Sequence, residues 1–333
     1  MKSVFICNDK NNYKKVYSDN TIEFLKVNAG FIDEVYDKEY VMAHIGEFFD
    51  VEFIFSTWGM PTFTEIEIKQ VFPNLKCVFY AAGTVQFFAR PFINCGVRVF
   101  SAWSANAIPV AEYTVAQIIL AGKRFFSACK KMSEGETKEA YIIRENYIGN
   151  YDSNVGIVGA GMIGAKVCEM LKNYKLNVKV FDPFLSDEKA KQLGVQKVEL
   201  DELFSTCNVV SNHLANNEQT QGIFVYKHFM SMPKYATFIN TGRGAQVVEN
   251  DLARALNERN DLAAVLDVTA YEPLQTGHPF FSLNNCFITP HIAGSGGRET
   301  FRMAEYIAEE FIRYISGDTL TCEVNNKMLE TMA

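Results

Sequence analysis

A chain of 333 residues, 48% hydrophobic and 21% charged, is long enough for two domains with buried cores and too apolar to be disordered. Lys and Arg number 32 against 39 Asp and Glu, and the net charge of −7 argues against nucleic acid as a partner. Mean hydropathy is −0.04 and no run approaches about 18 apolar residues, so we expect no membrane partner.

The first hundred residues alternate short apolar runs with amphipathic stretches. Strands are predicted at residues 4–7, 51–55 and 76–80, and helices at residues 17–27 and 65–71. This alternation is typical of a βα layer. Gly83 follows the carboxyl end of the strand that ends at Tyr80, where open parallel sheets usually bind their ligands.

A long helix is predicted from Asn106 to Phe126, and the charged stretch 130–150 that follows it is expected to be a surface excursion. A second βα series then begins. Its strands are predicted near residues 155–158, 177–181, 209–211, 237–240, 263–267 and 287–289. Strands that alternate with helices predict a doubly wound parallel sheet. A last helix, residues 299–315, is expected to pack back on the first layer.

The strongest motif is Gly-x-Gly-x-x-Gly, which lies between a predicted strand and a predicted helix at residues 155–164. Gly159 allows the tight turn, Gly161 lets a pyrophosphate approach the backbone, and Gly164 lets the helix pack closely on the strand. Asp182 ends the next predicted strand, where a carboxylate accepts hydrogen bonds from a ribose diol and repels a 2′-phosphate. The motif therefore predicts NAD rather than NADP as the cofactor.

Three further segments each follow a predicted strand and carry one ionisable residue beside Gly or Pro: Arg243, Glu272 and His291. Because the carboxyl ends of parallel strands line one crevice, these residues could surround the nicotinamide end of a dinucleotide. Each also has a simpler interpretation on its own: Arg243 in a surface ion pair, Glu272 as a solvated acid, His291 as a structural imidazole.

With these motifs the chain resembles the D-isomer-specific 2-hydroxyacid dehydrogenases, a family that includes phosphoglycerate, D-lactate and glyoxylate/hydroxypyruvate enzymes. The resemblance covers about Lys76 to Gly317 and rests on four motifs in the family's order, at residues 156–164, 239–244, 267–273 and 289–294. It implies an α/β protein of two doubly wound parallel-sheet domains. A flavodoxin-like substrate-binding domain, residues 1–104 plus 296–333, would be discontinuous, and a Rossmann NAD-binding domain would comprise residues 105–295. The resemblance also implies a homodimer.

The resemblance further implies an NAD-dependent oxidoreductase that transfers a hydride between nicotinamide and C2 of a small, D-specific 2-hydroxy or 2-keto acid. Arg243 would bind the substrate carboxylate and polarise the C2 carbonyl, and His291 would exchange a proton with its oxygen. Glu272 would orient His291 and favour its imidazolium form. The resemblance places further residues along the cofactor: Met162, Ile163, Asp182, Leu214, Thr241, Gly242, Asp267, Ala293 and Gly294. For Asp267, a cap at the strand end is the alternative.

The loop Ala81–Gln86 departs from the family, whose pattern at this place is Gly-x-Gly-x-Asp. One glycine and the aspartate are missing. Ala82 and Gly83 are still predicted to offer backbone N–H groups to a substrate carboxylate. Trp58, which follows a predicted strand, is the aromatic residue expected to contact the ligand.

Two other functions fit the same fold. An NAD(H)-sensing binding protein would keep the dinucleotide site without turnover, but it would not require Arg243, Glu272 and His291 together. A formate dehydrogenase would have a glutamine in place of Glu272. We therefore expect an enzyme, a D-2-hydroxyacid dehydrogenase or 2-keto acid reductase.

The remaining histidines and the cysteines are expected to have no part in the chemistry. His213 and His278 are assigned to packing and loop structure, whereas His44 and His228 fall in amphipathic helices and should be solvated. The eight cysteines show no C-x-x-C spacing, so we expect no metal and predict buried free thiols. The N-terminal apolar stretch is too short for a secretory signal, and a cytoplasmic protein is therefore predicted.

Overall fold

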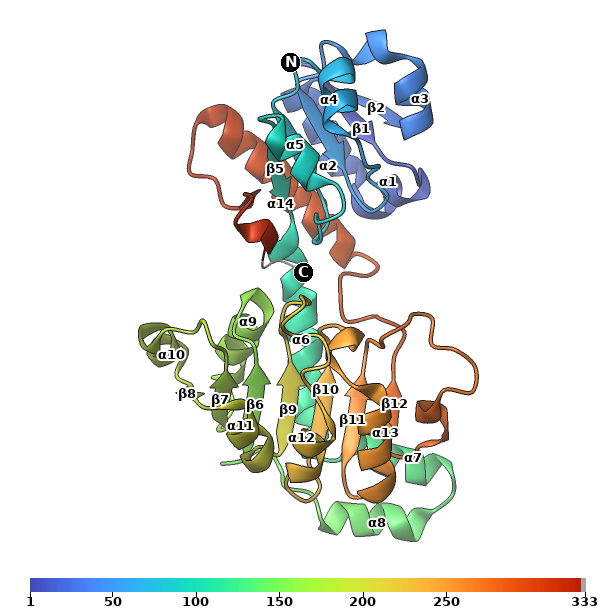
Figure 1. Ribbon diagram of the computed structural model, residues 1–333, viewed down its shortest axis with the longest axis vertical. Coiled ribbons are helices and arrows are strands. Elements are labelled where there is room, and N and C mark those ends of the chain that lie inside the picture. Colours follow the sequence, from blue (N-terminus) through green and yellow to red (C-terminus); the bar gives the residue numbers. More distant parts are fainter. Residues whose placement is uncertain (331–333) are drawn as a thin grey trace. The chain divides into compact units, whose positions relative to one another are not determined.

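The computed structural model describes residues 1–330 and divides into two compact units (Figure 1). Unit 1 comprises Met1–Asn106 together with the segment from Ser295 onward, and unit 2 comprises Ala107–Gly294. Residues 331–333, the end of the predicted substrate domain, lie outside the described residues. No helix within residues 1–330 has the length and apolar character needed to cross a membrane.

Unit 1 is built on one sheet with the order β2-β1-β3-β4-β5-β13. Its strands are β1 (Ser3–Ile6), β2 (Phe31–Tyr36), β3 (Phe53–Ser56), β4 (Cys77–Tyr80), β5 (Arg98–Ser101) and β13 (Glu323–Val324). Neighbouring strands are parallel except for β13, which pairs antiparallel with β5. The order of the first five strands is that of a flavodoxin-like sheet. Strands β1, β3 and β4 are buried along their whole length, as parallel strands covered on both faces are.

Helices cover both faces of this sheet; Figure 1 shows α4 and α5 in front of it and α2 and α14 behind it. The elements are α1 (Asn11–Val16), α2 (Asp19–Ala29), α3 (Lys38–Ala43), η1 (Ile45–Phe48), α4 (Glu65–Val71), α5 (Ala89–Asn94), α14 (Glu299–Ser316) and η4 (Met328–Glu330). Phe311 of α14 meets the rings of Phe53, Phe55 and Phe79 at centroid distances of 5.3–5.6 Å. The last helix therefore packs on the sheet formed by the first hundred residues, as predicted.

Unit 2 contains a parallel sheet with the order β8-β7-β6-β9-β10-β11-β12. Its strands are β6 (Asn154–Val158), β7 (Asn177–Phe181), β8 (Gln196–Lys197), β9 (Val209–Asn212), β10 (Thr237–Asn240), β11 (Ala263–Leu266) and β12 (Cys286–Ile288). Numbered from β6, this is the Rossmann order with one strand added at the end. The order reverses between β6 and β9, so the ligand crevice of such a sheet is expected at their carboxyl ends. The predicted fold class, two doubly wound α/β domains, is confirmed.

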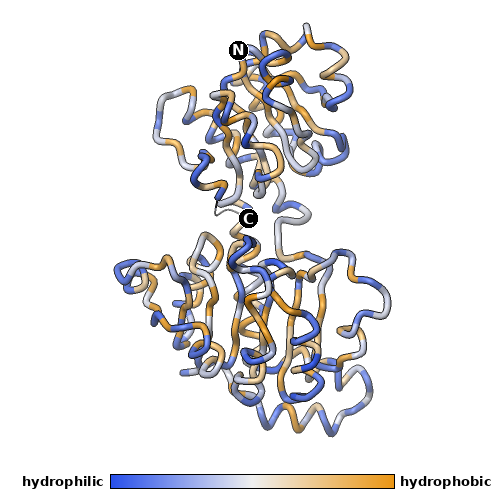
Figure 2. The backbone as a smooth tube through the Cα atoms, in the orientation of Figure 1, coloured by the Kyte–Doolittle hydropathy of each residue, from blue (hydrophilic) through white to orange (hydrophobic). Residues whose placement is uncertain are grey.

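Two layers of helices sandwich the unit 2 sheet. The elements are α6 (Trp103–Gly122), α7 (Phe125–Ser133), α8 (Thr137–Glu145), α9 (Met162–Leu171), α10 (Asp187–Leu193), α11 (Leu200–Thr206), α12 (Tyr226–Ser231), η2 (Gly244–Gln246), α13 (Glu249–Glu258) and η3 (Pro279–Ser282). Helices α11, α12 and α13 share one hydrophobic core with the sheet, and α6, α9 and α10 share the other. In Figure 2 the hydrophobic colour follows the strands, which both layers cover.

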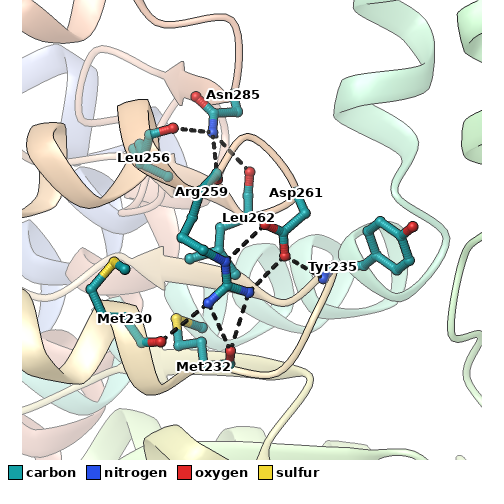
Figure 3. Close-up of polar contacts among 8 residues, drawn as sticks. All are labelled: Met230, Met232, Tyr235, Leu256, Arg259, Asp261, Leu262 and Asn285. Carbon is teal, nitrogen blue, oxygen red and sulfur yellow. Dashed lines mark hydrogen bonds and ion pairs between the residues drawn. The ribbon is translucent and has the colours of Figure 1, made fainter.

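A cluster of hydrogen-bonded polar residues lies at the amino ends of β10, β11 and β12 (Figure 3). The Arg259 guanidinium donates to both carboxylate oxygens of Asp261, at 2.8 and 2.6 Å, and to backbone carbonyls of the segment before β10. Asn285 donates to the carbonyls of Leu256 and Leu262, both at 3.0 Å. These bonds stabilise the amino ends of the strands. The carboxyl ends, which the predicted site residues follow, lie at the opposite edge of the sheet.

The stretch 130–150 is the predicted surface excursion: it contains the end of α7 and all of α8, and among their described side chains these two helices together bury Ala140 alone. Two local predictions are wrong. His228 is buried rather than solvated: its Nδ1 accepts the Val225 N–H at 3.2 Å, and its Nε2 lies 3.1 Å from Asp201. All eight cysteines are free, but Cys129 is exposed and Cys95 only partly buried.

Candidate active site

The predicted site residues of unit 2 follow the carboxyl ends of its parallel strands. Gly159 follows β6, Asp182 follows β7, Leu214 lies just beyond β9, and Thr241 to Arg243 follow β10. Asp267 follows β11, and His291 lies three residues after β12. Because all strands of this sheet are parallel, these residues lie along one edge.

The glycine-rich loop has the backbone that its motif requires. Gly159 has a φ of +89°, and a Cβ there would lie 3.0 Å from the backbone of His213. A Cβ on Gly164 would lie 1.9 Å from the Gly159 carbonyl oxygen, so α9 can pack against the loop only without a side chain at this position. Around Gly161, by contrast, a Cβ would meet nothing within 4 Å. Two glycines therefore serve packing, and the third faces open space.

Asp182 is tied to the glycine-rich loop. Its Oδ2 accepts the Ala160 N–H at 2.7 Å, and its Oδ1 accepts the Phe184 N–H at 2.8 Å. Each carboxylate oxygen has two lone pairs and can accept one more hydrogen bond. The side chain is thus held in place while it remains able to accept from a ribose hydroxyl.

These features fit a dinucleotide. No side chain caps α9, so the first N–H groups of this ten-residue helix can bind an anion such as a pyrophosphate. The open space at Gly161 would admit the phosphates, and Met162 is half exposed beside it. Asp182 adds a carboxylate at the neighbouring strand. The residues of the motif are thus candidates to hold the cofactor, and their contacts with it stay predictions.

His291 and Glu272 lie in contact at the carboxyl edge. The distance between His291 Nδ1 and Glu272 Oε2 is 2.8 Å, and the side chains are 48% and 39% exposed. His291 has a φ of +54°, a left-handed conformation that is uncommon outside glycine, and its N–H is shared between the carbonyls of Asp267 and Thr289. With Nδ1 engaged by the carboxylate, Nε2 is the nitrogen free to act on a substrate.

Arg243 is partly buried next to this pair. Its Nη1 donates to the Gly242 carbonyl at 2.8 Å. Burial lowers the pKa of Arg243 from its ordinary value, and the negative charge of Glu272 opposes this effect. A guanidinium stays charged under such a shift, so Arg243 remains a cation able to bind a carboxylate. The structure thus brings together Arg243, Glu272 and His291.

Asp267 is buried, and its carboxylate takes its hydrogen bonds from the chain itself. Oδ1 accepts from the Thr289 hydroxyl at 2.6 Å and the Ile292 N–H at 2.9 Å, and Oδ2 accepts from the Ala293 N–H at 2.9 Å. The last two donors directly follow His291. Asp267 therefore holds the loop in which His291 lies.

A buried amide network, missed by the sequence analysis, joins the loops after β9 and β10. Asn212 Nδ2 donates to Asn240 Oδ1 at 2.9 Å and to Gln246 Oε1 at 2.6 Å. Gln246 also accepts from the Arg243 N–H at 3.2 Å and donates to the Leu214 carbonyl at 3.0 Å. The network fixes the backbone from Thr241 to Arg243. The only signal in the sequence is that two neighbouring strands both end in asparagine.

In unit 1 the predicted residues Ala82 and Gly83 lie directly after β4. The Ser101 hydroxyl donates to both of their carbonyls, at 2.8 and 2.7 Å, and the Thr57 hydroxyl donates to the Ala81 carbonyl at 2.9 Å. Within residues 1–330, the N–H groups of Ala82 and Gly83 have no hydrogen-bond partner. Gly83 is partly exposed, whereas Ala82 is buried in the core of unit 1.

The aromatic residues around this loop differ in exposure. Trp58 follows β3 and is 37% exposed, and its carbonyl accepts hydrogen bonds from Cys7 and Asn12. Phe87 is 50% exposed, whereas Phe88 is buried against Tyr80. Contact between Trp58 and a ligand stays a prediction.

The fold and the site define a class: a Rossmann dinucleotide-binding protein with a histidine–carboxylate pair and an arginine at the carboxyl edge of its sheet. A family model described as D-isomer specific 2-hydroxyacid dehydrogenase, NAD binding domain, matches residues 115–293. The chain belongs to the D-isomer specific 2-hydroxyacid dehydrogenase family, and the predicted family and cofactor, NAD, are confirmed.

Named relatives agree with this membership. The chain is 28% identical over 270 residues to the D-3-phosphoglycerate dehydrogenase of Archaeoglobus fulgidus, covering 81% of this chain but 51% of that protein. It is 28% identical over 269 residues to the glyoxylate reductase of Korarchaeum cryptofilum, covering 80% of this chain and 81% of that one. The chain thus spans about half the length of the first of these relatives.

Solved structures share the fold. The apo form of Rhodotorula graminis D-mandelate dehydrogenase superposes with a TM-score of 0.80 at 20% identity, covering 97% of each chain. The NAD-complexed D-isomer specific 2-hydroxyacid dehydrogenase of Lactobacillus delbrueckii ssp. bulgaricus gives 0.77 at 18% identity, covering 97% of this chain and all of that one. At such identities the similarity establishes the fold alone.

Proposed function

We propose that this protein is an NAD-dependent oxidoreductase that transfers a hydride between nicotinamide and C2 of a small D-2-hydroxy or 2-keto acid. The observation that carries the proposal is the 2.8 Å pair of His291 and Glu272, beside the Arg243 guanidinium, at the carboxyl edge of an NAD-binding domain. Nothing in these residues favours an NAD(H)-sensing protein, because binding alone does not require a proton-exchanging pair next to an anion-binding arginine.

The roles of the side chains follow from their chemistry. NAD, when bound, supplies or accepts the hydride. Arg243 binds the substrate carboxylate through its planar fork of donors and polarises the C2 carbonyl. His291 holds a proton at Nε2 and gives it to the C2 oxygen during reduction, or takes it during oxidation. Glu272, at Nδ1, keeps the imidazole oriented.

The remaining site residues are proposed by the same reasoning. Unit 2 is proposed as the NAD-binding domain, with the cofactor along the residues that line its carboxyl edge: Gly159, Gly161, Met162, Ile163, Gly164, Asp182, Leu214, Thr241, Gly242, Asp267, Ala293 and Gly294. Unit 1 is proposed as the substrate-binding domain. Ala82 and Gly83 would offer their unpaired N–H groups to the substrate, and Trp58 its exposed ring.

The test is NADH oxidation by the purified protein with a panel of 2-keto acids: glyoxylate, pyruvate, hydroxypyruvate, phosphohydroxypyruvate and branched or aromatic examples. In the reverse direction, the rates of NAD reduction are compared between D- and L-2-hydroxy acids. We expect turnover of at least one keto acid, oxidation of the D isomer, and loss of activity in His291→Asn with NADH binding retained. His44→Asn, which changes an exposed histidine of unit 1, is the matched control. NADH binding without turnover of any keto acid would contradict the proposal.

We also propose a homodimer that forms through the surface of α7 and α8. Within residues 1–330, α7 has no buried side chain, and α8 buries Ala140 alone. Met132, Tyr141 and Ile142 are 51–61% exposed, an apolar surface that a second copy would cover. Light scattering should give the mass of a dimer for the wild type and of a monomer for Tyr141→Lys with Ile142→Lys. Ile66→Lys, on the exposed side of α4, should remain dimeric, and a monomeric wild type would overturn this proposal.

The proposed compartment is the cytoplasm. All eight cysteines are free thiols, the state that a reducing compartment maintains. Cell fractionation with the protein expressed from its own gene tests this directly. Recovery from an oxidising compartment, or with paired cysteines, would contradict it.

A further inference from the structure

The loop that carries Glu272 determines where this carboxylate lies. Glu272 Oε1 accepts the Thr269 N–H at 3.3 Å, while Oε2 faces His291. The Thr269 hydroxyl in turn donates to the Tyr271 carbonyl at 2.9 Å. Glu272 is thus oriented by the Thr269 N–H, and the position of the backbone at Thr269 and Ala270 sets its contact with His291.

Two groups outside the loop hold that backbone. A Cβ on Gly244, the residue after Arg243, would lie 1.9 Å from the Thr269 carbonyl carbon and 2.3 Å from the Ala270 nitrogen. The loop therefore packs directly on the Arg243 segment. From the other direction, Glu249 Oε1 accepts the Ala270 N–H at 2.9 Å.

Glu249 also binds the far end of the same loop. Its Oε2 lies 3.3 Å from Nε2 of His278, and the two side chains are only 15% and 20% exposed. His278 Nδ1 accepts the Phe280 N–H at 3.4 Å, which leaves the proton on Nε2, facing Glu249. One carboxylate therefore joins Ala270 to His278, on either side of Glu272.

Glu249 lies on a helix that packs on the core of unit 2. Glu249 begins α13, whose inner face buries Leu252 and Leu256 in the core of unit 2. A carboxylate in the first turn of a helix is also stabilised by the helix dipole. Asp251, two residues further, shares that dipole but accepts the N–H of Tyr226, the first residue of α12, at 2.9 Å. The two acids therefore hold different segments: Glu249 the Glu272 loop, and Asp251 the start of α12.

We propose that Glu249, together with His278, is a positioning residue of the active site: it holds the Glu272 loop where Glu272 meets His291. The kinetic part of this inference rests on the proposed function. Its structural part, the placement of Glu272 against His291, does not.

The kinetic test compares Glu249→Ala with Asp251→Ala and Glu249→Gln. In Glu249→Ala we expect kcat to fall about tenfold, because a misplaced partner lowers the rate without weakening uniform binding. The KM and Kd for NADH should stay unchanged. Glu249→Gln keeps an oxygen acceptor for the Ala270 N–H and should restore most of the rate. Asp251→Ala controls for the loss of an acid from the first turn of α13 and should retain the wild-type kcat.

The structural test needs neither cofactor nor substrate. The chain has five histidines, so the ring nitrogen signals of His291 can be assigned by NMR with His291→Asn. In Glu249→Ala we expect the Nδ1 signal of His291 to move toward its position in Glu272→Ala, while Asp251→Ala leaves it unchanged. A wild-type signal in Glu249→Ala would overturn the inference, as would equal rates in Glu249→Ala and Asp251→Ala. An inactive wild type with the expected NMR shift would refute the proposed function alone.

Discussion

His213 should make the stability of unit 2 fall as the pH is lowered. The residue follows β9, and its backbone borders Gly159 of the glycine-rich loop. The ring is buried, with Nε2 2.9 Å from the Ser211 hydroxyl and Nδ1 without a partner among residues 1–330. Burial, which penalises the charged imidazolium, lowers the pKa of His213 to about 3.

The sign and size follow from proton linkage. In the unfolded chain, a histidine binds a proton below pH ~6.5, whereas folded His213 stays neutral down to about pH 3. The neutral folded ring thus contributes stability that is fully present above the unfolded pKa and is lost as the pH falls below it. Between pH ~8 and ~5, only the unfolded chain binds this proton, over about 1.5 pH units below its pKa. The free energy of unfolding therefore falls by about 2 kcal/mol in this range.

Urea unfolding of the wild type and of His213→Gln, followed by circular dichroism at several pH values, measures this contribution. Other groups also titrate, but they are common to both proteins and cancel in the difference. We expect the wild type to lose about 2 kcal/mol more than His213→Gln between pH ~8 and ~5. His44→Gln, which removes an exposed histidine, should follow the wild type. Parallel curves for wild type and His213→Gln would refute the reasoning.

Three substitutions test the backbone of the site. In Gly164→Ala the new Cβ meets the Gly159 carbonyl at 1.9 Å; we expect a loss of about 3 kcal/mol in urea unfolding and no NADH fluorescence enhancement, and normal binding would contradict this. Asp267→Asn leaves one oxygen as acceptor, so one of the two backbone donors loses its partner. We expect the free energy of unfolding to fall by about 1–3 kcal/mol and kcat to fall with it, and unchanged values would contradict this role. Gly244→Ala should lower kcat while the Kd for NADH holds, whereas Gly296→Ala, with open space around it, should behave as wild type.

The strands and the glycine motif of unit 2 could be predicted because their signals are local. Val155 to Val158 is an apolar run that leads directly into glycines, and β7 and β10 occur within the ranges that alternation predicts. In unit 1, β2 and β5 have no such signal: β2 mixes acidic and apolar residues, and β5 begins with Arg98. Their assignment depends on neighbouring strands, which a local pattern does not contain.

The supporting bonds of the site could not be predicted, because their partners are distant in sequence. Asn212 reaches Gln246 across 34 positions, and Glu249 reaches Ala270 across 21. Amides and acids at the ends of strands and helices look like ordinary turn and cap residues, and nothing in the sequence says which loop they hold. The ionisable residues of the site follow from strand ends; the groups that orient them follow only from the fold.

For Asp267, the sequence predicts a residue of the site, and the fold determines which groups this residue holds. A left-handed residue other than glycine costs about 1–2 kcal/mol, so the conformation of His291 requires compensation nearby. The Asp267 carboxylate supplies it by accepting the two N–H groups that follow His291, and charge-assisted bonds of this kind are roughly twice as strong as neutral ones. The strand-end cap, the alternative that the sequence left open for Asp267, is therefore what positions His291. A contact with nicotinamide would use a remaining lone pair of the same carboxylate, so the cofactor and the histidine loop would share one anchor.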